Sequence, residues 1–332
     1  MAVLKHSIGA QTKLSPKGDL AIAAKIPKSR TGGTFMAARQ KNAYCPEPVP
    51  FLKWAGGKRS QLKFLKEKIG IVEGNFFEPF LGGGAVMFGL SNQIHGHVIA
   101  GDLNSELILT YQVVRDSVEE LIVELSRFRN EKDFYLNVRA WDRQEGYNQR
   151  SKIERAARFI YLNRTGFNGL YRVNSQGFFN VPFGLQSYTN LTNAENLRAV
   201  SEHLRGRNGP KKVKLFNSTY KSVTGQAKSG DTVYFDPPYD PLTPSASFVS
   251  YQKDGFSKED QRQLMEEARR LAGLGCRVFI SNSCTPYIES LYADEEIFLV
   301  HKISVARQIG ASASSRGRVQ EVLIESRTGV ER

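Results

Sequence analysis

The sequence predicts an α/β protein whose central sheet is mostly parallel, with helices on both faces and a long helical segment inserted into the chain. The main observation is an alternation of strands and helical segments. Apolar stretches that read as strands lie near residues 76, 98, 213, 232 and 277. Parallel neighbours need crossover connections, which helices usually supply, so this order favours a parallel sheet covered on both faces.

The individual elements follow from their apolar spacing. Residues 105–125 and 258–272 carry apolar side chains at helical intervals, whereas residues 276–281, Cys-Arg-Val-Phe-Ile-Ser, read as a buried strand. The chain of 332 residues is long enough for two domains. We expect an α/β domain at 45–105 and 213–332, and a helical domain at 106–212 beside the carboxyl edge of the sheet.

The most specific chemical signal is the tetrapeptide Asp236-Pro237-Pro238-Tyr239, which closes the apolar run 232–235. An exocyclic amine on a nucleobase is a poor nucleophile, because its lone pair is delocalised into the ring. Asp236 can accept one N–H of such an amine and the carbonyl of Pro237 the other, while prolines hold that carbonyl in place and Tyr239 stacks on the base. A strand followed by an ordinary proline turn is the alternative.

A second signal is the segment 75–86, in which an apolar strand runs into three glycines and the start of a helix. Glycines allow a backbone to approach a ligand closely, although such a turn is also a plain connection. The next strand, 98–102, ends in Asp102, which is placed to bind the hydroxyls of a ribose. A triphosphate loop is disfavoured because the segment lacks the Gly-Lys-Ser/Thr ending.

Residues 51–58, Phe-Leu-Lys-Trp-Ala-Gly-Gly-Lys, taken alone, also suit a basic surface loop. Together with Glu-Pro-Phe-Leu-Gly-Gly-Gly at 78–84, Asp-Leu-Asn at 102–104 and the tetrapeptide, in this order, they strongly resemble the Dam family of adenine-N6 DNA methyltransferases. The resemblance spans about residues 49–325. It implies a Rossmann-like methyltransferase fold with an inserted helical DNA-recognition domain, in the alpha order of amino-methyltransferases.

The resemblance also implies S-adenosyl-L-methionine as the cofactor. Family members contact it through the tryptophan and second lysine of the first motif, the acid that ends the second strand, and the Asp of the tetrapeptide. Segment 80–84 should lie beneath the methionine part. The cofactor-binding residues expected here are Trp54, Lys58, Glu78, Phe80, Gly82, Gly84, Asp102 and Asp236.

Residues 158–174 begin as an apolar helix and then interleave arginines, asparagines, aromatics and glycines, a mixture that suits base contact but also occurs on ordinary surfaces. The stretch resembles the family's Leu-Asn-Arg-Tyr-Gly-Tyr-Asn-Gly-Leu-Cys-Arg-Tyr-Asn. By that match Phe167 and Asn168 would wedge the site of the orphaned base, Leu170 and Arg172 would read bases, and Lys53 would read the outer pair. Arg164 completes the expected DNA-binding set, and the implied target is GATC.

Residues 180–184 follow the family pattern, but 185–190 read Leu-Gln-Ser-Tyr-Thr-Asn where the family has Arg and Lys. We expect weaker phosphate contacts and lower processivity. The polar, aromatic loop 245–256 is either a surface connection or a lid in which Phe248 and Tyr251 line the flipped adenine.

The net charge of +13 favours a polyanionic partner. Residues 1–44 hold eight Lys or Arg and one acid, and we expect a disordered tail. A leader without function and a DNA-holding arm are equally good interpretations, a targeting peptide is a third, and Met36 could be the true start.

The three cysteines, Cys45, Cys276 and Cys284, are widely spaced, and the five histidines form no His-Glu-x-x-His motif. We therefore expect no metal and a reducing compartment. No apolar run approaches membrane-spanning length. The expected protein is a cytoplasmic, nucleoid-associated monomer of a bacterium or phage.

The sequence thus predicts a site-specific adenine-N6 methyltransferase that acts on a flipped adenine in double-stranded DNA. The alternatives are a methyltransferase for cytosine N4 or another amino group, which Ser or Asn at 236 would have favoured, and a catalytically silent DNA-binding relative.

Overall fold

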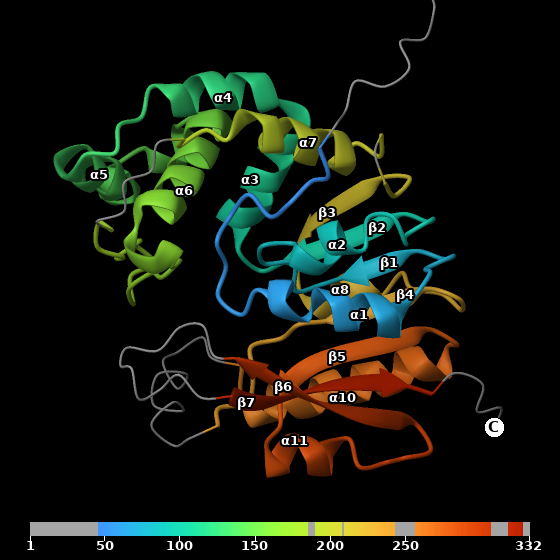
Figure 1. Ribbon diagram of the computed structural model, residues 1–332. Coiled ribbons are helices and arrows are strands. Elements are labelled where there is room, and N and C mark those ends of the chain that lie inside the picture. The colour runs from blue at the N-terminus through green and yellow to red at the C-terminus, as the bar shows by residue number, and fades with distance from the viewer. Residues whose placement is uncertain (1–45, 185–189, 208, 243–255, 307–317, 328–332) are drawn as a thin grey trace, which may run out of the picture. The chain divides into compact units, whose positions relative to one another are not determined.

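The computed structural model describes residues 46–184, 190–207, 209–242, 256–306 and 318–327, all within one compact unit, Tyr44–Arg332 (Figure 1). The predicted tail, Met36, Cys45, residues 185–189, Phe248 and Tyr251 lie outside the described residues. The contacts within this unit do not divide it into two domains. The expected boundaries between an α/β domain and a helical domain therefore stay a prediction.

The sheet has seven strands in the order β3-β2-β1-β4-β5-β7-β6. Neighbours among β3, β2, β1, β4 and β5 are parallel, whereas β7 runs antiparallel between β5 and β6. The strands are β1 Phe76–Glu78, β2 Val98–Asp102, β3 Val213–Asn217, β4 Thr232–Phe235, β5 Arg277–Ser283, β6 Phe298–Ala306 and β7 Arg318–Ser326. This order confirms the predicted α/β class with a mostly parallel sheet.

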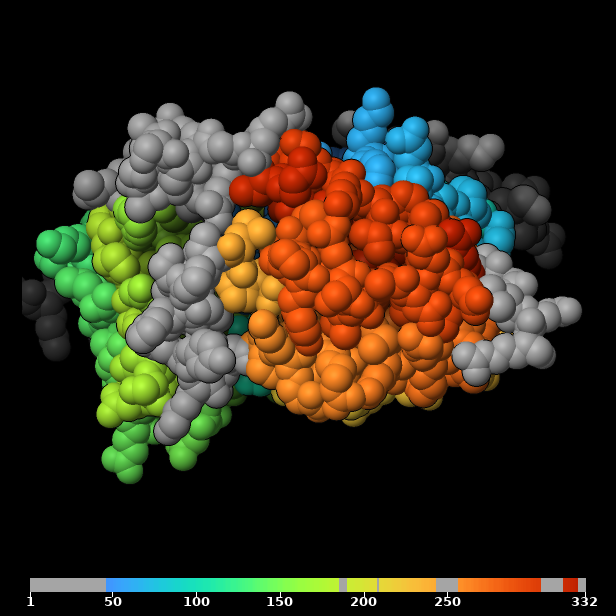
Figure 2. Space-filling view, turned by 90° about the horizontal axis from the view of Figure 1, so that it is seen from below, coloured from blue at the N-terminus to red at the C-terminus, as the bar shows by residue number. Residues whose placement is uncertain are grey.

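Helices cover both faces of the sheet because successive strand residues point to opposite sides. In β1, Phe76 joins a core that includes side chains of α1, α2 and α3, whereas Phe77 joins a second core with α8, α10 and α11. These helices are α1 Leu62–Ile69, α2 Ala85–Gly89, α3 Ser105–Asp116, α8 Tyr220–Thr224, α10 Lys258–Gly273 and α11 Pro286–Leu291. In Figure 2 the orange and red residues, which include α10, α11 and the β5–β7–β6 side of the sheet, form one continuous surface.

The insert between β2 and β3 is helical, as predicted, and is built around α6 (Lys152–Thr165). A capping box of Ser151 and Glu154 starts this helix, and every side chain from Ala156 to Thr165 is buried. Its neighbours are α3, α4 (Val118–Ser126) and α5 (Lys132–Arg139). The insert closes with α7 (Ala194–Leu204), which packs on α3 and α4.

The structure differs from the sequence prediction in two places. The expected helical stretch 105–125 is broken into α3 and α4 at Ser117, whose φ of −140° and ψ of 46° are not helical. The antiparallel strands β6 and β7 were not predicted. Among the described residues, no helix has the length and apolar character needed to cross a membrane.

Candidate functional site

Three predicted carboxylates meet at one edge of the sheet. Glu78 ends β1, Asp102 ends β2, and Asp236 follows the last residue of β4. Since β2, β1 and β4 are adjacent and parallel, their carboxyl ends lie side by side. In open α/β sheets this edge is where ligands bind.

Asp236 is held by a buried lysine. The ammonium of Lys58 lies 2.7 Å from Oδ1 of Asp236, and the two side chains are 3% and 22% exposed. Lys58 also donates to the carbonyl of Gly56 at 2.6 Å. Burial raises the pKa of Asp236 above its usual value, and the nearby charge of Lys58 partly opposes that rise. The ammonium of Lys58 therefore favours the charged carboxylate at the strand end, against the effect of burial.

Tyr239 lies beside this pair, and both its ring face and its hydroxyl are in contact with other side chains. The Lys58 ammonium lies 4.9 Å from the ring centroid. The hydroxyl donates to Oε2 of Glu321 at 3.1 Å, and Gln61 Nε2 donates to the same oxygen at 2.8 Å. Burial raises the pKa of Tyr239 well above its usual value, so the hydroxyl stays protonated and remains a donor.

The segment that follows Asp236 is anchored from behind by a buried polar network. Gln261 Nε2 donates to the carbonyl of Pro238 at 2.9 Å, and Asn282 Nδ2 donates to Gln261 Oε1 at 2.9 Å. Asn282 Oδ1 accepts from the backbone N–H of Asp240 at 3.0 Å, and Thr285 donates to the Asp240 carboxylate at 2.6 Å. Gln261 and Asn282 are fully buried, so α10 and β5 together fix the backbone of the tetrapeptide.

Glu78 lies beneath the glycine turn and is only 2% exposed. Its Oε2 accepts from the backbone N–H of Met87, within α2, at 2.9 Å. Burial, reinforced by the charge of Asp236, raises the pKa of Glu78 well above its usual value. Ionisation of Asp236 therefore makes ionisation of Glu78 less favourable.

Asp102 ties the glycine turn to the end of β2. Its Oδ2 accepts from the N–H of Gly82 at 3.0 Å, and its Oδ1 accepts from the N–H of Asn104 at 2.9 Å. Burial raises the pKa of Asp102, and these two hydrogen bonds oppose the rise. Asn217 Nδ2 donates to the carbonyls of Asp102 and Leu103, which connects the end of β3 to the same edge.

The glycines of the turn allow Trp54 to approach closely. A Cβ atom on Gly82, whose φ is +47°, would lie 2.6 Å from Trp54 Cδ1. The Trp54 ring is also stacked on Tyr171 of the insert, with centroids 5.7 Å apart. Gly84 has a φ of +68°, and a Cβ there would lie 2.8 Å from the hydroxyl of Tyr111. Side chains at these two positions would push apart the first motif, the turn and the insert.

Phe80 belongs to an aromatic group at the same edge. Its ring is stacked on Tyr220 at 5.5 Å between centroids, and it contacts Phe235 and Phe256 edge to face. The sequence motifs included Phe80 but gave no indication of Tyr220.

The predicted DNA-binding residues other than Arg164 lie on or beside one loop. Asn163 connects the segments, since its side chain bonds both the N–H and the carbonyl of Lys53 and also the carbonyl of Gly169. The stem of Lys53 lies against Gly169. The 3-10 turn Phe167–Gly169 follows, with Phe167 52% exposed and Asn168 at a φ of 55°. Leu170 is partly buried, and the exposed Arg172 donates to Asn180 at 2.8 Å.

Arg164 differs from these residues. It is 8% exposed, and its guanidinium donates to the backbone carbonyls of Leu191 and Phe51. These donors hold segments of the protein together, and the expectation that Arg164 touches DNA stays a prediction. The interleaving of basic and aromatic residues indicated the loop but not which arginine points inward.

Four polar residues that hold the tetrapeptide were not identified from the sequence: Gln61, Gln261, Asn282 and Glu321. The only available signal was a run of polar residues, Ser281 to Ser283, at the end of an otherwise apolar strand. Among the described residues, no group of three or more His, Cys, Asp or Glu side chains is arranged to hold a metal ion.

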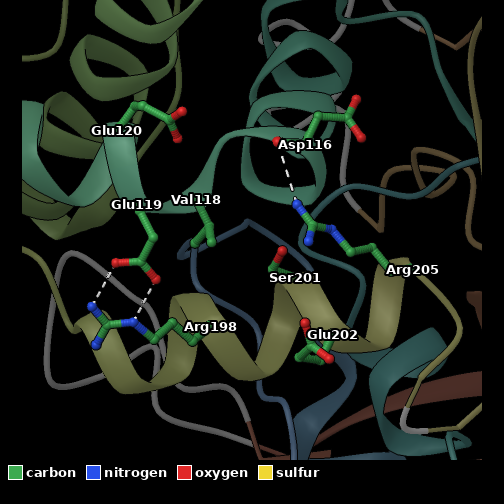
Figure 3. Close-up of a pocket in the computed structure, with 8 residues that line it drawn as sticks. All are labelled: Asp116, Val118, Glu119, Glu120, Arg198, Ser201, Glu202 and Arg205. Atoms are coloured by element: carbon green, nitrogen blue, oxygen red, sulfur yellow. Dashed lines mark hydrogen bonds and ion pairs between the residues drawn. The ribbon is translucent and has the colours of Figure 1, made fainter. Parts of the chain in front are cut away.

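A hollow of about 330 Å³ lies elsewhere, between the end of α3 and α7 (Figure 3). Both of its arginines already bind within the chain: Arg198 forms two hydrogen bonds with Glu119, and Arg205 donates to the carbonyls of Arg115 and Asp116. Asp116 ends α3, which begins at the carboxyl edge and leads away from it by roughly 16 Å at 1.5 Å per residue. The hollow is therefore not part of the site at the strand ends.

Comparison with known proteins assigns the chain to a family. Residues 54–308 match the model of the D12 class N6 adenine-specific DNA methyltransferases. The type II methyltransferase M1.LlaDCHI of Lactococcus lactis subsp. cremoris is 40% identical over 277 residues, which cover 83% of this chain and 94% of that protein.

Two further relatives are similar to this chain over most of its length. The type II methyltransferase M.MjaIII of Methanocaldococcus jannaschii is 38% identical over 84% of this chain and 99% of its own length. The DNA adenine methylase of Escherichia coli K12 is 32% identical over 84% of this chain and 96% of its own length. These matches confirm the resemblance to Dam-type DNA adenine methylases. The mostly parallel seven-stranded sheet agrees with the expected Rossmann-like methyltransferase fold. Because the matches extend over most of the chain and nearly all of each relative, the chain belongs to the D12 class of N6 adenine-specific DNA methyltransferases.

Proposed function

We propose that the protein transfers a methyl group from S-adenosylmethionine to N6 of an adenine turned out of duplex DNA, with GATC as the target. The observation that carries the chemical part is the Asp236 carboxylate, held 2.7 Å from Lys58 at the end of β4, in a segment whose backbone is anchored by Gln261 and Asn282. Membership of an adenine-specific family supports adenine over cytosine as the base.

The residues at the strand ends fit S-adenosylmethionine by their chemistry. Asp102, at the end of β2, suits the hydroxyls of a ribose, and the Phe80–Tyr220 stack offers an apolar surface for the adenine ring of the cofactor. Asp236, whose charge the ammonium of Lys58 supports, is suited to a positively charged sulfonium, and Glu78 lies at the neighbouring strand end. When bound, S-adenosylmethionine supplies an electrophilic methyl group.

The remaining predicted cofactor residues shape the site. Gly82 and Gly84 keep the turn close to Trp54 and Tyr111, so that backbone rather than side chain faces the ligand. Trp54 closes the turn on the side of the insert. Lys58 would have a second use, because its ammonium is a cation that suits the carboxylate of the methionine part of the cofactor.

The adenine is activated by two acceptors. Asp236 accepts one N–H of the exocyclic amine and the carbonyl of Pro237 accepts the other, which returns lone-pair density to nitrogen. Tyr239 stacks on the extruded base and replaces part of the stacking that the base loses in leaving the duplex. Pro238 serves the backbone, since its carbonyl already accepts from Gln261.

Recognition of the target is assigned to Lys53, Phe167, Asn168, Leu170 and Arg172. Asn163 holds Lys53 and Gly169 together, so these side chains belong to one surface of the insert and the first motif. Phe167 is 52% exposed and suits the space left by the extruded base. Arg164 is not included, because its guanidinium is bonded to backbone carbonyls. Because the proposed substrate is DNA, we also propose a cytoplasmic location for the protein.

The test uses the full chain, methyl-labelled S-adenosylmethionine and two duplexes that differ only in having GATC or GTAC at their centre. Nucleoside mass spectrometry identifies the modified base, and sequencing locates it. N6-methyladenine confined to GATC is the expected result. N6-methyladenine in both duplexes would overturn the target, N4-methylcytosine would overturn the base, and no methylated product would overturn the activity.

A further inference from the structure

We propose that Glu321 is a positioning residue of the base-binding pocket, which fixes the ring of Tyr239 through its hydroxyl and couples that ring to the segment that carries Lys58. The inference rests on the proposed function, because it assumes that Tyr239 stacks on the target adenine. It adds a residue that lies beyond the part of the chain matched by the family model, 54–308.

Glu321 reaches the site from β7. That strand pairs with both β5 and β6, and Glu321 is opposite Ser283 in one and Ile303 in the other. Ser283 is the last residue of β5, which is the neighbour of β4. Its position in the sheet therefore places the Glu321 carboxylate near the carboxyl end of β4, where the tetrapeptide begins.

One carboxylate oxygen of Glu321 receives two donors from different motifs. The hydroxyl of Tyr239 lies at 3.1 Å and Nε2 of Gln61 at 2.8 Å. Gln61 is 7% exposed and ends the 3-10 helix Lys58–Gln61. Since the Lys58 ammonium faces the Tyr239 ring at 4.9 Å, the contacts form a closed circuit through Glu321, Tyr239, Lys58 and Gln61.

This circuit has a consequence for base binding. A tyrosine ring can rotate about two side-chain bonds, and a stacking partner is effective only when its plane is already set. A hydrogen bond to a charged acceptor is stronger than one between neutral groups, so Glu321 restrains the ring more firmly than a neutral partner would. Removal of Glu321 should therefore lower kcat/KM for DNA more than it lowers the affinity for the cofactor.

The matched control is Glu325 on the same strand. Its Oε2 lies 2.9 Å from His301 Nε2 on β6. Glu325→Ala therefore removes an acid from β7, as Glu321→Ala does, but its partner lies away from Tyr239. A loss that arose only from damage to the sheet would appear in both variants. A loss through Tyr239 would appear only in Glu321→Ala.

The experiment is a double-mutant cycle in the full chain with Glu321→Ala, Tyr239→Phe and both together, and with Glu321→Gln as the conservative variant. Tyr239→Phe keeps the ring and removes the hydroxyl. The readouts are kcat/KM for a duplex that the wild type methylates, binding of S-adenosylmethionine, and the fluorescence of 2-aminopurine placed at the target base.

We expect kcat/KM for DNA to fall on the order of tenfold in Glu321→Ala, with cofactor affinity unchanged, partial recovery in Glu321→Gln, and no further loss when Tyr239→Phe is added. Losses that multiply in the double variant, or wild-type kinetics in Glu321→Ala, would overturn the inference. If Glu321→Ala does not fold, the same cycle run with Glu321→Gln decides by the same criterion. Failure of the wild type to methylate adenine would instead refute the proposed function.

Discussion

Nζ of Lys58 lies 2.7 Å from Oδ1 of Asp236, which joins the first motif of the chain to the end of β4. Burial opposes the charge on Asp236, and the ammonium of Lys58 supports it. The catalytic role proposed for Asp236 requires an acceptor, so the state of this pair governs whether the site can act on an amine.

Replacement of Asp236 by Ala should abolish methyl transfer while cofactor and DNA binding stay measurable, because the carboxylate orients the amine more than it builds the pocket. The free energy of unfolding should also fall, by about 3 kcal/mol, since Lys58 would lose its buried partner. Radiolabel transfer, equilibrium binding and urea denaturation measure the three quantities. Activity within a few-fold of wild type would contradict the mechanism.

Replacement of Lys58 by Met should move the acid limb of the kcat–pH profile to higher pH. Lys58 lowers the pKa of Asp236 against the effect of burial, so its removal raises that pKa further and more of the carboxyl is protonated at a given pH. Coincident acid limbs in variant and wild type would show that ionisation of Asp236 does not control the rate.

The same variant should change the pH dependence of stability. A carboxyl whose folded pKa is raised stabilises the folded state below its unfolded pKa, here near 3.8, and that stability is lost as the pH rises through the folded value. Lys58→Met raises the folded value, so the loss should be larger and extend to higher pH. Urea denaturation of both proteins across this range measures it.

Replacement of Gln261 by Leu should lower stability by about 1–3 kcal/mol and reduce kcat, because the carbonyl of Pro238 and the amide of Asn282 would lose their partner in a buried site. The control is Gln263→Leu on the same helix, whose side chain bonds Glu259 and Lys221 at the surface. We expect a change within about 0.5 kcal/mol there. Equal effects of the two variants would refute the anchoring role.

Arg172→Ala and Arg164→Ala should separate recognition from stability. Arg172 is exposed, and its loss should reduce discrimination between GATC and single-base variants by about 1–3 kcal/mol with little change in unfolding. Arg164 holds two backbone carbonyls, so its loss should lower the melting temperature and leave discrimination unchanged. Methylation of a panel of variant duplexes, with thermal denaturation of each protein, checks both expectations, and a reversed pattern would exchange the two roles.

The parallel strands β1, β2, β4 and β5 were predictable because they are buried on both faces and read as short apolar runs, as in Thr232–Phe235. Strands β6 and β7 mix charged and apolar residues and pair antiparallel, so their sequence carries a weaker signal. The break at Ser117 was not predictable either, since apolar spacing continues through it.

The predicted acids did lie together, because the carboxyl ends of adjacent parallel strands share an edge. The residues that hold the tetrapeptide were missed for the opposite reason. Gln261 and Glu321 come from a helix and a strand far along the chain, and only the tertiary fold shows what they bond. The buried position of Arg164 likewise depends on contacts with Phe51 and Leu191.

The sheet order also bears on the order of synthesis. Strand β7 lies between β5 and β6, and both of these leave the ribosome before it. The nascent chain can assemble the parallel strands and the acidic edge early, but an open position remains beside β5 until residues 318–326 arrive. Since β7 carries Glu321, translation of this last strand completes both the hydrogen bonding of the sheet and the restraint on Tyr239. A ribosome-bound intermediate that lacks β7 would therefore hold an incomplete pocket, and Tyr239 would gain its restraint only after residues 318–326 have been made.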